Sequence, residues 1–383
     1  MVNYDFLSVY FYSVPNLRFS YKGDWSKRKL NEICQFFKGN GLSKSDLSNE
    51  GFPCILYGEL YTTYKNEVIS DIISKTNTTL SNPFLSRNND LIIPGSGEDP
   101  IDIAVARAIC QNDIILGGDL NILRPKSNVS AAFLSYQLNG VRRYDIAKKA
   151  QGKSIVHLHN SDLKEVLVSI PTYNEQLHIV KLLTKVDEMI ETQSKIIDSY
   201  FSLSKAISNT LIGQSKGNTR LRECLNCYSS NTMESVIKQE DLGDYPVYGA
   251  NGIIKKINNY EIEYPSIAIV KDGSGVGKMF KLSGKYSILS TLNYLTSKPG
   301  YDIDYIYYAL KQKSLKKYVV GSGIPHIYFK DYEQEKIYIP QNELQQQNIT
   351  SVLQSIDEEI GNEIKQLKNY ELLKKYLLKN MFV

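Results

Sequence analysis

Two long stretches of the chain repeat apolar residues every three to four positions, a spacing that predicts amphipathic helices. Both stretches keep a seven-residue frame, which is typical of a coiled-coil seam. The seam positions of the first stretch are Leu183, Val186, Ile190, Ile197, Tyr200 and Leu211. Those of the second are Leu353, Ile356, Ile360, Leu367, Tyr370 and Met381. We therefore expect two helices that pair through these residues.

The two predicted helices begin alike, because Thr172 and Asn342 each follow a proline at a capping position. We place the helices at residues 172–215 and 341–383, with Gly213 ending the first. At about 40 residues each they are roughly 60 Å long, too long to lie within one small domain. Pairing with each other is the expected solution.

Polar residues interrupt both seams at equivalent places. Gln193 corresponds to Glu363, and Ser204 corresponds to Lys374. Such interruptions usually fix the register of a helix pair at some cost in stability.

The rest of the sequence consists of short apolar runs separated by Gly, Pro and Asn, typical of strands and turns. The clearest expected strands are Asp90–Pro94, Ser266–Val270 and Glu335–Ile339. The clearest short helices are Ala131–Leu138 and Asp304–Leu310. We therefore predict an α+β fold for two globular domains. Their expected bounds are residues 25–171 and 216–340, after an arm at residues 1–24.

The chain also contains one pattern twice. Gly152–His157 returns as Gly321–His326, shifted by 169 positions, and the Asp187-Glu188 pair in the first helix returns as Asp357-Glu358. Fainter matches join Gly95–Gly97 to Gly273–Gly275, and Leu120–Leu123 to Leu292–Leu295. The chain thus reads as domain, helix, domain, helix. Antiparallel pairing of the helices about an approximate two-fold axis would keep the two domains a fixed distance apart.

Composition narrows the function only slightly. The net charge of +4 and the pI of about 8.5 suit a polyanionic partner but are common without one. The 28 tyrosines suit wet interfaces, or reflect the codons of an A/T-rich genome. No charge-free run of 18 apolar residues exists, and the start lacks a signal-peptide pattern, so we expect a cytoplasmic protein with no membrane contact.

Neither a metal site nor a catalytic constellation is expected. The five cysteines predict reduced thiols, and the Cys224–Cys227 pair lacks two further zinc ligands nearby. The glycine-rich stretch Asp272–Lys278 departs from a phosphate-binding loop at Asp272 and at Met279, which favours a turn between strands. Asn82-Pro83-Phe84 lacks the second proline of the loop with which amino-methyltransferases hold an adenine. We expect no enzyme activity from this chain alone.

Basic and hydroxyl-bearing loops are the candidate nucleic-acid contacts, since cations bind phosphates and polar side chains bond base edges. In the first half the candidates are Tyr61, Thr62, Thr63, Lys65, Arg142, Arg143, Lys148, Lys149, Lys153, Ser154 and His157. In the second half they are Asn251, Lys255, Lys256, Lys271, Lys316, Lys317, Ser322 and His326. Solvated charged faces, and half-buried structural roles for His157 and His326, remain the alternatives.

The order and duplication of these segments resemble the specificity subunits of type I restriction-modification systems over nearly the whole chain. The segments that carry the resemblance are Val14–Phe19, Trp25–Ile33, Gly41–Lys44, Pro53–Tyr64, Tyr245–Ile253, Gly323–Ile327 and the two Ile-Pro pairs that lead into the helices. The sequence departs from the family in lacking a third helix-length segment at its amino end.

The resemblance implies that two target-recognition domains each read one half of a split, asymmetric site in double-stranded DNA. It implies two modification subunits on the helices, which would use S-adenosylmethionine to methylate adenine at N6. Restriction subunits, which would use ATP and Mg²⁺, would join them. No cofactor is expected in this chain.

Two other functions fit the residues. A coiled-coil scaffold could space two protein-binding domains without contacting DNA. An enzyme could use the Asp272–Lys278 loop as an anion site.

Overall fold

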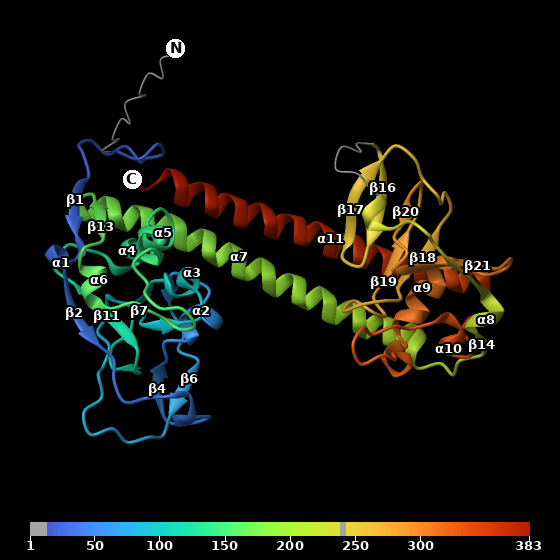
Figure 1. The fold of residues 1–383 in the computed structure, drawn as a ribbon, viewed down its shortest axis with the longest axis horizontal. Helices are drawn as coiled ribbons and strands as arrows, with labels where there is room; N and C mark the ends of the chain where they lie inside the picture. Colours follow the sequence, from blue (N-terminus) through green and yellow to red (C-terminus); the bar gives the residue numbers. More distant parts are fainter. Residues whose placement is uncertain (1–13, 238–242) are drawn as a thin grey trace, which may run out of the picture. The chain divides into compact units, whose positions relative to one another are not determined.

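The computed structural model describes residues 14–237 and 243–383, drawn in colour in Figure 1. It divides into two compact units. Unit 1 combines the chain up to Ser194 with Lys365–Val383, and unit 2 comprises Lys195–Ile364. The boundary between the units therefore falls inside both long helices, after Ser194 in the first and after Ile364 in the second.

A mixed sheet with the strand order β2-β11-β7-β9-β5 lies at the centre of unit 1. Its strands are β2 (Cys34–Lys38), β5 (Val68–Ile69), β7 (Asp90–Pro94), β9 (Arg107–Ile109) and β11 (Leu120–Pro125). A second sheet, in the order β10-β4-β6-β3, consists of β3 (Leu47–Ser48), β4 (Phe52–Ile55), β6 (Ser74–Thr76) and β10 (Ile115–Leu116). The expected strand at Asp90–Pro94 is fully buried, as its continuous apolar run predicts.

Helix α4 (Ala131–Asn139) contacts β7 and β9 in unit 1, and Trp25 lies against its buried Phe133. The Trp25 ring also contacts Phe382, so the core of unit 1 combines residues from its first and its last segment. The smaller elements are β1 (Ser26–Lys29), α1 (Leu30–Ile33), α2 (Glu59–Thr62), β8 (Ser96–Gly97), α3 (Pro100–Ile103), α5 (Arg143–Ala147), β12 (Val156–His157), α6 (Asn160–Lys164) and β13 (Leu167–Ile170).

Unit 2 has a sheet in the order β15-β21-β18-β19 and a second in the order β17-β16-β20. The strands are β15 (Leu225–Ser229), β16 (Tyr245–Gly249), β17 (Gly252–Ile257), β18 (Ser266–Val270), β19 (Met279–Leu282), β20 (Ser287–Ile288) and β21 (Leu292–Ser297). The other elements are β14 (Thr219–Arg220), α8 (Leu221–Cys224), α9 (Ile303–Lys311), α10 (Phe329–Tyr332) and β22 (Lys336–Ile337).

The two units share one internal plan. In each, an antiparallel trio (β2-β11-β7 or β15-β21-β18) carries the core, and a parallel pair (β4 with β10, or β16 with β20) flanks it. The pairs β1–β13 and β14–β22 are likewise equivalent. The repeated pattern of the sequence is therefore a repeated fold.

The long helices are α7 (Tyr173–Ser208), which continues as a π-helical segment at Asn209–Gly213, and α11 (Glu343–Asn380). Both are slightly shorter than predicted. The Thr172 hydroxyl accepts the N–H of Glu175 at 3.4 Å, and the Asn342 side chain accepts the N–H of Leu344 at 2.9 Å. Both expected capping residues thus satisfy a free amide at a helix start.

Each unit by itself shows the helices running antiparallel. In unit 1 the beginning of α7 shares an apolar cluster with Leu377 and Met381 near the end of α11. In unit 2 Ile212, in the π-helical segment that continues α7, shares a cluster with Ile349 and Leu353 near the beginning of α11.

The twelve predicted seam residues are all buried or half-buried. The buried ones are Leu183, Val186, Ile197, Leu353, Ile360 and Met381. The half-buried ones are Ile190, Tyr200, Leu211, Ile356, Leu367 and Tyr370.

The described part of the expected arm, residues 14–24, contacts both long helices within unit 1. The Leu17 N–H donates to the Asn380 carbonyl oxygen at 2.8 Å, and Arg18 forms an ion pair with Glu175 at 2.6 Å. Residues 1–13 of the arm lie outside the described residues.

Candidate nucleic-acid interface

Unit 1 has a hollow of about 700 Å³ at the end of its parallel strand pair. Residues Leu56–Gly58, which follow β4, form one wall, and Gly118 and Asp119, which follow β10, form another. Thr62 at the end of α2 and Thr63 directly after it complete the hollow together with Lys44 and neighbouring residues.

Unit 2 has a hollow of about 430 Å³. It is lined by Gly249 at the end of β16 with the two residues after it, by Ser290 and Thr291 after β20, and by the turn Asp272–Gly275. The Asn251 side chain accepts a hydrogen bond from Lys278 at 3.1 Å.

Strand register shows that the two hollows occupy equivalent places. Ile55 of β4 stands opposite Leu116 of β10, and Tyr248 of β16 stands opposite Ile288 of β20. The residues that follow these pairs line the hollow in both units, but they differ in kind. Leu-Tyr-Gly in unit 1 corresponds to Gly-Ala-Asn in unit 2, and Gly-Asp corresponds to Ser-Thr. One scaffold therefore presents two different chemical surfaces.

The repeated Gly-x-x-Ile-x-His segments form a loop beside each hollow. In unit 1, His157 pairs with Gln151 across the loop and with Ser96 of β8, whose hydroxyl donates to Asp119 of the hollow. In unit 2, His326 pairs in the same way with Val320 and with Asp272.

These pairings correct one expected match of the repeat. Because Ser96 and Asp272 face equivalent histidines, Gly95–Gly97 corresponds to Lys271–Gly273, two residues before the expected Gly273–Gly275. The Leu158 N–H donates to Gly95 and the Ile327 N–H to Lys271, both at 2.9 Å, in the same register. The hydrogen-bond register therefore shows which residues of the two units are equivalent, and here it differs from the match suggested by residue identity.

Eight of the eleven candidates of the first half fall into two groups. Thr62 and Thr63 line the hollow, and the neighbouring Tyr61 is half-buried, which raises the pKa of its phenol. The residues at or near the loop, with exposed or half-exposed side chains, are Lys148, Lys149, Lys153, Ser154 and His157.

Three candidates of the first half lie elsewhere. The Arg142 guanidinium donates to the Val383 carbonyl oxygen at 2.9 Å, and Arg143 donates to that of Ile101 at 3.0 Å. Lys65 lines a separate hollow of about 700 Å³ beside α11. The two arginines thus bond backbone atoms that are distant in the sequence, and neither lines the hollow formed by Leu56–Gly58 and Asp119.

In the second half, Asn251 lines the hollow, and Lys271 stands at its edge after β18. Lys255 and Lys256 lie on β17. The loop carries or adjoins Lys316, Lys317, Ser322 and His326. Lys317 also forms an ion pair with Glu335, whose pKa is lowered by hydrogen bonds from Lys317 and Tyr318.

The glycine-rich stretch Asp272–Lys278 is the turn between β18 and β19, as its departures from a phosphate loop indicated. Its amides are used within the chain: Gly273 donates to Pro325, Gly277 to Val270 and Lys278 to Gly275. These three amides therefore bond within the chain, as expected of a turn between strands.

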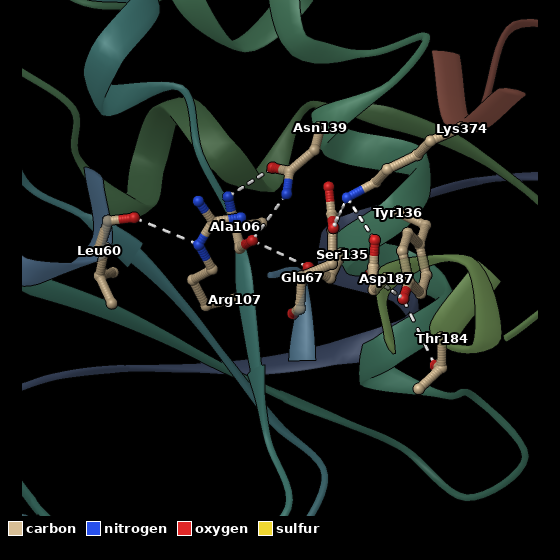
Figure 2. A network of polar contacts seen from close by, with 10 residues as sticks. All are labelled: Leu60, Glu67, Ala106, Arg107, Ser135, Tyr136, Asn139, Thr184, Asp187 and Lys374. Carbon is tan, nitrogen blue, oxygen red and sulfur yellow. Dashed lines mark hydrogen bonds and ion pairs between the residues drawn. The ribbon is translucent and has the colours of Figure 1, made fainter. Parts of the chain in front are cut away.

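Unit 1 contains a buried network of charged and polar side chains that was not predicted from the sequence (Figure 2). Lys374 of α11 forms ion pairs with Glu67 at 2.6 Å and with Asp187 of α7 at 2.7 Å, and the Tyr136 hydroxyl donates to Asp187 at 2.7 Å. Burial by itself lowers the pKa of Lys374, but the two carboxylates outweigh it and raise the pKa, so the ammonium stays charged. In the sequence, the interrupted seam at Lys374 and the repeated Asp187-Glu188 pair pointed to this place, but nothing marked Glu67.

The cysteine thiols and the potential metal ligands are the other candidate functional groups in the described residues. Burial raises the pKa of the Cys224 thiol to about 12 and that of Cys227 to about 11, which leaves both protonated. Among residues 14–237 and 243–383, no three His, Cys, Asp or Glu side chains gather as a metal site requires. Within the same part of the chain, no helix is both long and apolar enough to cross a membrane.

Known proteins carry the same plan. A specificity subunit of a type I restriction enzyme from Methanocaldococcus jannaschii is 34% identical over 169 residues, 40% of this chain but only 39% of that relative. A putative type I specificity subunit from Mycoplasma genitalium is 24% identical over 96% of both chains. The crystal structure of a type I restriction-modification S subunit from M. genitalium has the same fold, with a TM-score of 0.69 at 20% identity over 97% of this chain and 99% of that one.

The family model for the type I restriction modification DNA specificity domain matches the chain twice, at residues 22–199 and 219–369. The two matches coincide with the repeated domain-plus-helix pattern and cover most of the sequence. The chain therefore belongs to the type I restriction modification DNA specificity family.

Proposed function

We propose that this chain is the DNA-recognition subunit of a type I restriction-modification complex and reads a bipartite, asymmetric duplex sequence, one part with each half. The observation that carries the proposal is the pair of equivalent hollows with different linings. Base edges in the major groove differ in their donors, acceptors and methyl groups, so different linings select different bases.

The linings offer the required chemistry. Thr62 and Thr63 supply hydroxyls in unit 1, whereas Asn251, Ser290 and Thr291 supply an amide and hydroxyls in unit 2. Exposed lysines on the neighbouring loops fit phosphate contacts, which position a protein on DNA without reading sequence.

The catalytic work belongs to partner subunits in this proposal. Two modification subunits would dock on the long helices and methylate adenine at N6 with S-adenosylmethionine, and restriction subunits would use ATP and Mg²⁺. The number of base pairs between the two parts of the site would depend on the heptads of α7 and α11.

Co-expression with the modification subunit encoded beside this chain, followed by mapping of N6-methyladenine in host DNA, tests the proposal. We expect one methylated motif in two parts. Thr63→Ala should alter or relax only one part, and Asn251→Ala only the other, by about 1–3 kcal/mol of discrimination at the affected base. Ser215→Ala, which removes an exposed hydroxyl outside both hollows and after the helical segment, is the matched control.

Binding to random duplex DNA provides a second measurement. The complex should lose affinity steeply as salt rises, because cations on the protein displace counterions from phosphates. Salt-insensitive binding together with an absent motif would instead favour a protein-binding scaffold.

A further inference from the structure

The two Gly-x-x-Ile-x-His loops each present an exposed isoleucine. Ile155 is 57% exposed and Ile324 is 71% exposed, although both sit in ordered loops closed by backbone pairing. Single exposed apolar side chains are common on proteins. An exposed isoleucine at the same loop position in two halves that otherwise differ points to a role that both halves share.

The backbone of each loop is built to hold its isoleucine outward. Gly152 has φ +134° and Gly321 has φ +96°, conformations that side chains rarely adopt. A methyl group on either glycine would collide with the carbonyl oxygen of the isoleucine three residues later. The close approach that makes these loops tight is therefore reserved for glycine in both halves.

Both loops lie beside the hollows and among hydrophilic groups. Gly273, which lines the hollow of unit 2, donates its N–H to Pro325 of the loop at 2.8 Å. In unit 1 the link runs through Ser96 and Asp119. Exposed basic and hydroxyl side chains at and just before the loops are Lys148, Lys153 and Ser154 in unit 1, and Lys316 and Ser322 in unit 2.

The comparison of the halves separates two kinds of contact. The linings of the hollows differ, as discrimination between two base sequences demands. The isoleucines, glycines and histidines of the loops are the same, so they cannot be the source of that difference. A shared contact beside a variable one suits a part of DNA that does not depend on sequence.

We infer that Ile155 and Ile324 pack against duplex DNA, one in each half, as sequence-independent apolar contacts flanked by phosphate-binding lysines. The surface they would cover is the apolar face of deoxyribose and base steps, against which proteins commonly set Ile, Leu or Phe. This inference rests on the proposed function, because it requires the halves to bind DNA.

The test uses the full chain assembled with its modification subunits, and duplexes that contain or lack the methylated motif. Ile155→Ser and Ile324→Ser should each weaken binding to both duplexes by about tenfold, since each loses the burial of one large side chain. The methylated motif should stay unchanged. The slope of log affinity against log salt should also stay unchanged, whereas Lys153→Ser should lower its magnitude by about 1.

Three controls sharpen the result. Leu167→Ser removes a side chain of similar exposure on β13 and should leave affinity within twofold. Ile155→Val keeps an apolar tip and should behave almost like the native chain. The fluorescence of Trp25, the single tryptophan, should match the native chain in the unit 1 variants.

Affinities within twofold of native for both isoleucine variants would overturn the inference while leaving the proposed function standing. A change of motif, a loss confined to the motif-bearing duplex, or a failure to assemble with the modification subunits would also overturn it. A native complex that binds neither duplex and methylates no motif would refute the proposed function, and the inference with it.

Discussion

The junction between domain and helices is built from the same parts in both units, with one added charge in unit 1. Tyr136 donates to Asp187 in unit 1, and the equivalent Tyr308 donates to Asp357 in unit 2 at 3.0 Å. Unit 1 adds Lys374, whereas the equivalent position, Ser204, carries no charge.

A further shared contact anchors the start of each helix. The Gln176 side chain donates to the Pro171 carbonyl oxygen, and Gln346 donates to that of Pro340. The shared tyrosine and glutamine contacts dock a domain on its helix, while the unshared lysine links α11 to both α7 and Glu67. The comparison teaches that docking is common to the halves and that the charged link distinguishes them.

The largest expected effect comes from removing that charge. Lys374→Met leaves the carboxylates of Glu67 and Asp187 buried without their cation, which should lower the free energy of unfolding of unit 1 by about 3–5 kcal/mol. Urea unfolding followed by Trp25 fluorescence measures it, because the tryptophan lies in the core of unit 1.

Ser204→Met at the equivalent position should change the unfolding of unit 2 by less than about 1 kcal/mol. Adding Asp187→Asn and Glu67→Gln to Lys374→Met should recover most of the loss, since no buried charge then remains unpaired. A loss below about 1 kcal/mol in Lys374→Met would contradict the assigned network.

The tyrosines offer the next comparison. Tyr136→Phe removes a buried hydrogen bond to a carboxylate and should cost about 1.5–3 kcal/mol. Tyr308→Phe should cost less, about 1 kcal/mol, because the bond to Asp357 is longer and only part-buried. Denaturant unfolding by fluorescence for the first and by far-ultraviolet circular dichroism for the second checks the order. Equal losses would show that the length and burial of the bond do not set its contribution.

The loop glycines should respond alike in both halves. Gly152→Ala and Gly321→Ala force the backbone to shift, at a cost of about 1–2 kcal/mol in local opening. Hydrogen exchange of the His157 and His326 amides, which donate across their loops at 2.7 and 2.8 Å, should accelerate by about tenfold. Gly361→Ala in α11 is the control, because a methyl group there meets nothing within 4 Å. It should slow the exchange of these two histidine amides or leave it unchanged. Acceleration in only one loop would mean that the two are not equivalent.

The smallest effect concerns two equivalent carboxylates. Glu165 accepts from Lys29, and Glu335 accepts from Lys317 and Tyr318, so the pKa of each is lowered. A lowered pKa stabilises the fold above the ordinary value of about 4.5, and the contribution disappears as pH falls through the lowered value.

We therefore expect Glu335→Gln to lower the free energy of unfolding by less than about 0.5 kcal/mol near neutral pH, because solvent screens the site. The difference from the native chain should vanish on acidification below pH 4.5. Unfolding curves at several pH values check this, and a difference that persists in acid would point to packing rather than charge.

The repeat, the helix pair and several strands could be predicted because their signals are local. Asp90–Pro94 and Ser266–Val270 form the expected strands, and Thr172 and Asn342 cap the expected helices. Periodicity and capping chemistry act over a few residues, so a single sequence displays them.

Contacts between distant residues could not be predicted in the same way. Glu67 and Lys374 lie 307 positions apart, and nothing local marks the glutamate as a partner. Arg142 and Arg143 are of the residue type that binds phosphates. In the folded chain they donate to the carbonyl oxygens of Val383 and Ile101, which the sequence does not indicate. The roles of all the candidate DNA contacts, Arg142 and Arg143 included, stay predictions.

The discontinuous make-up of unit 1 has a consequence for biosynthesis. Its core includes Phe382 between Trp25 and Phe133, so it stays incomplete on the ribosome until residues 365–383 have emerged from the exit tunnel. Unit 2, one continuous span, can be complete earlier. We therefore expect a nascent first half to expose apolar surface during that interval, which favours aggregation.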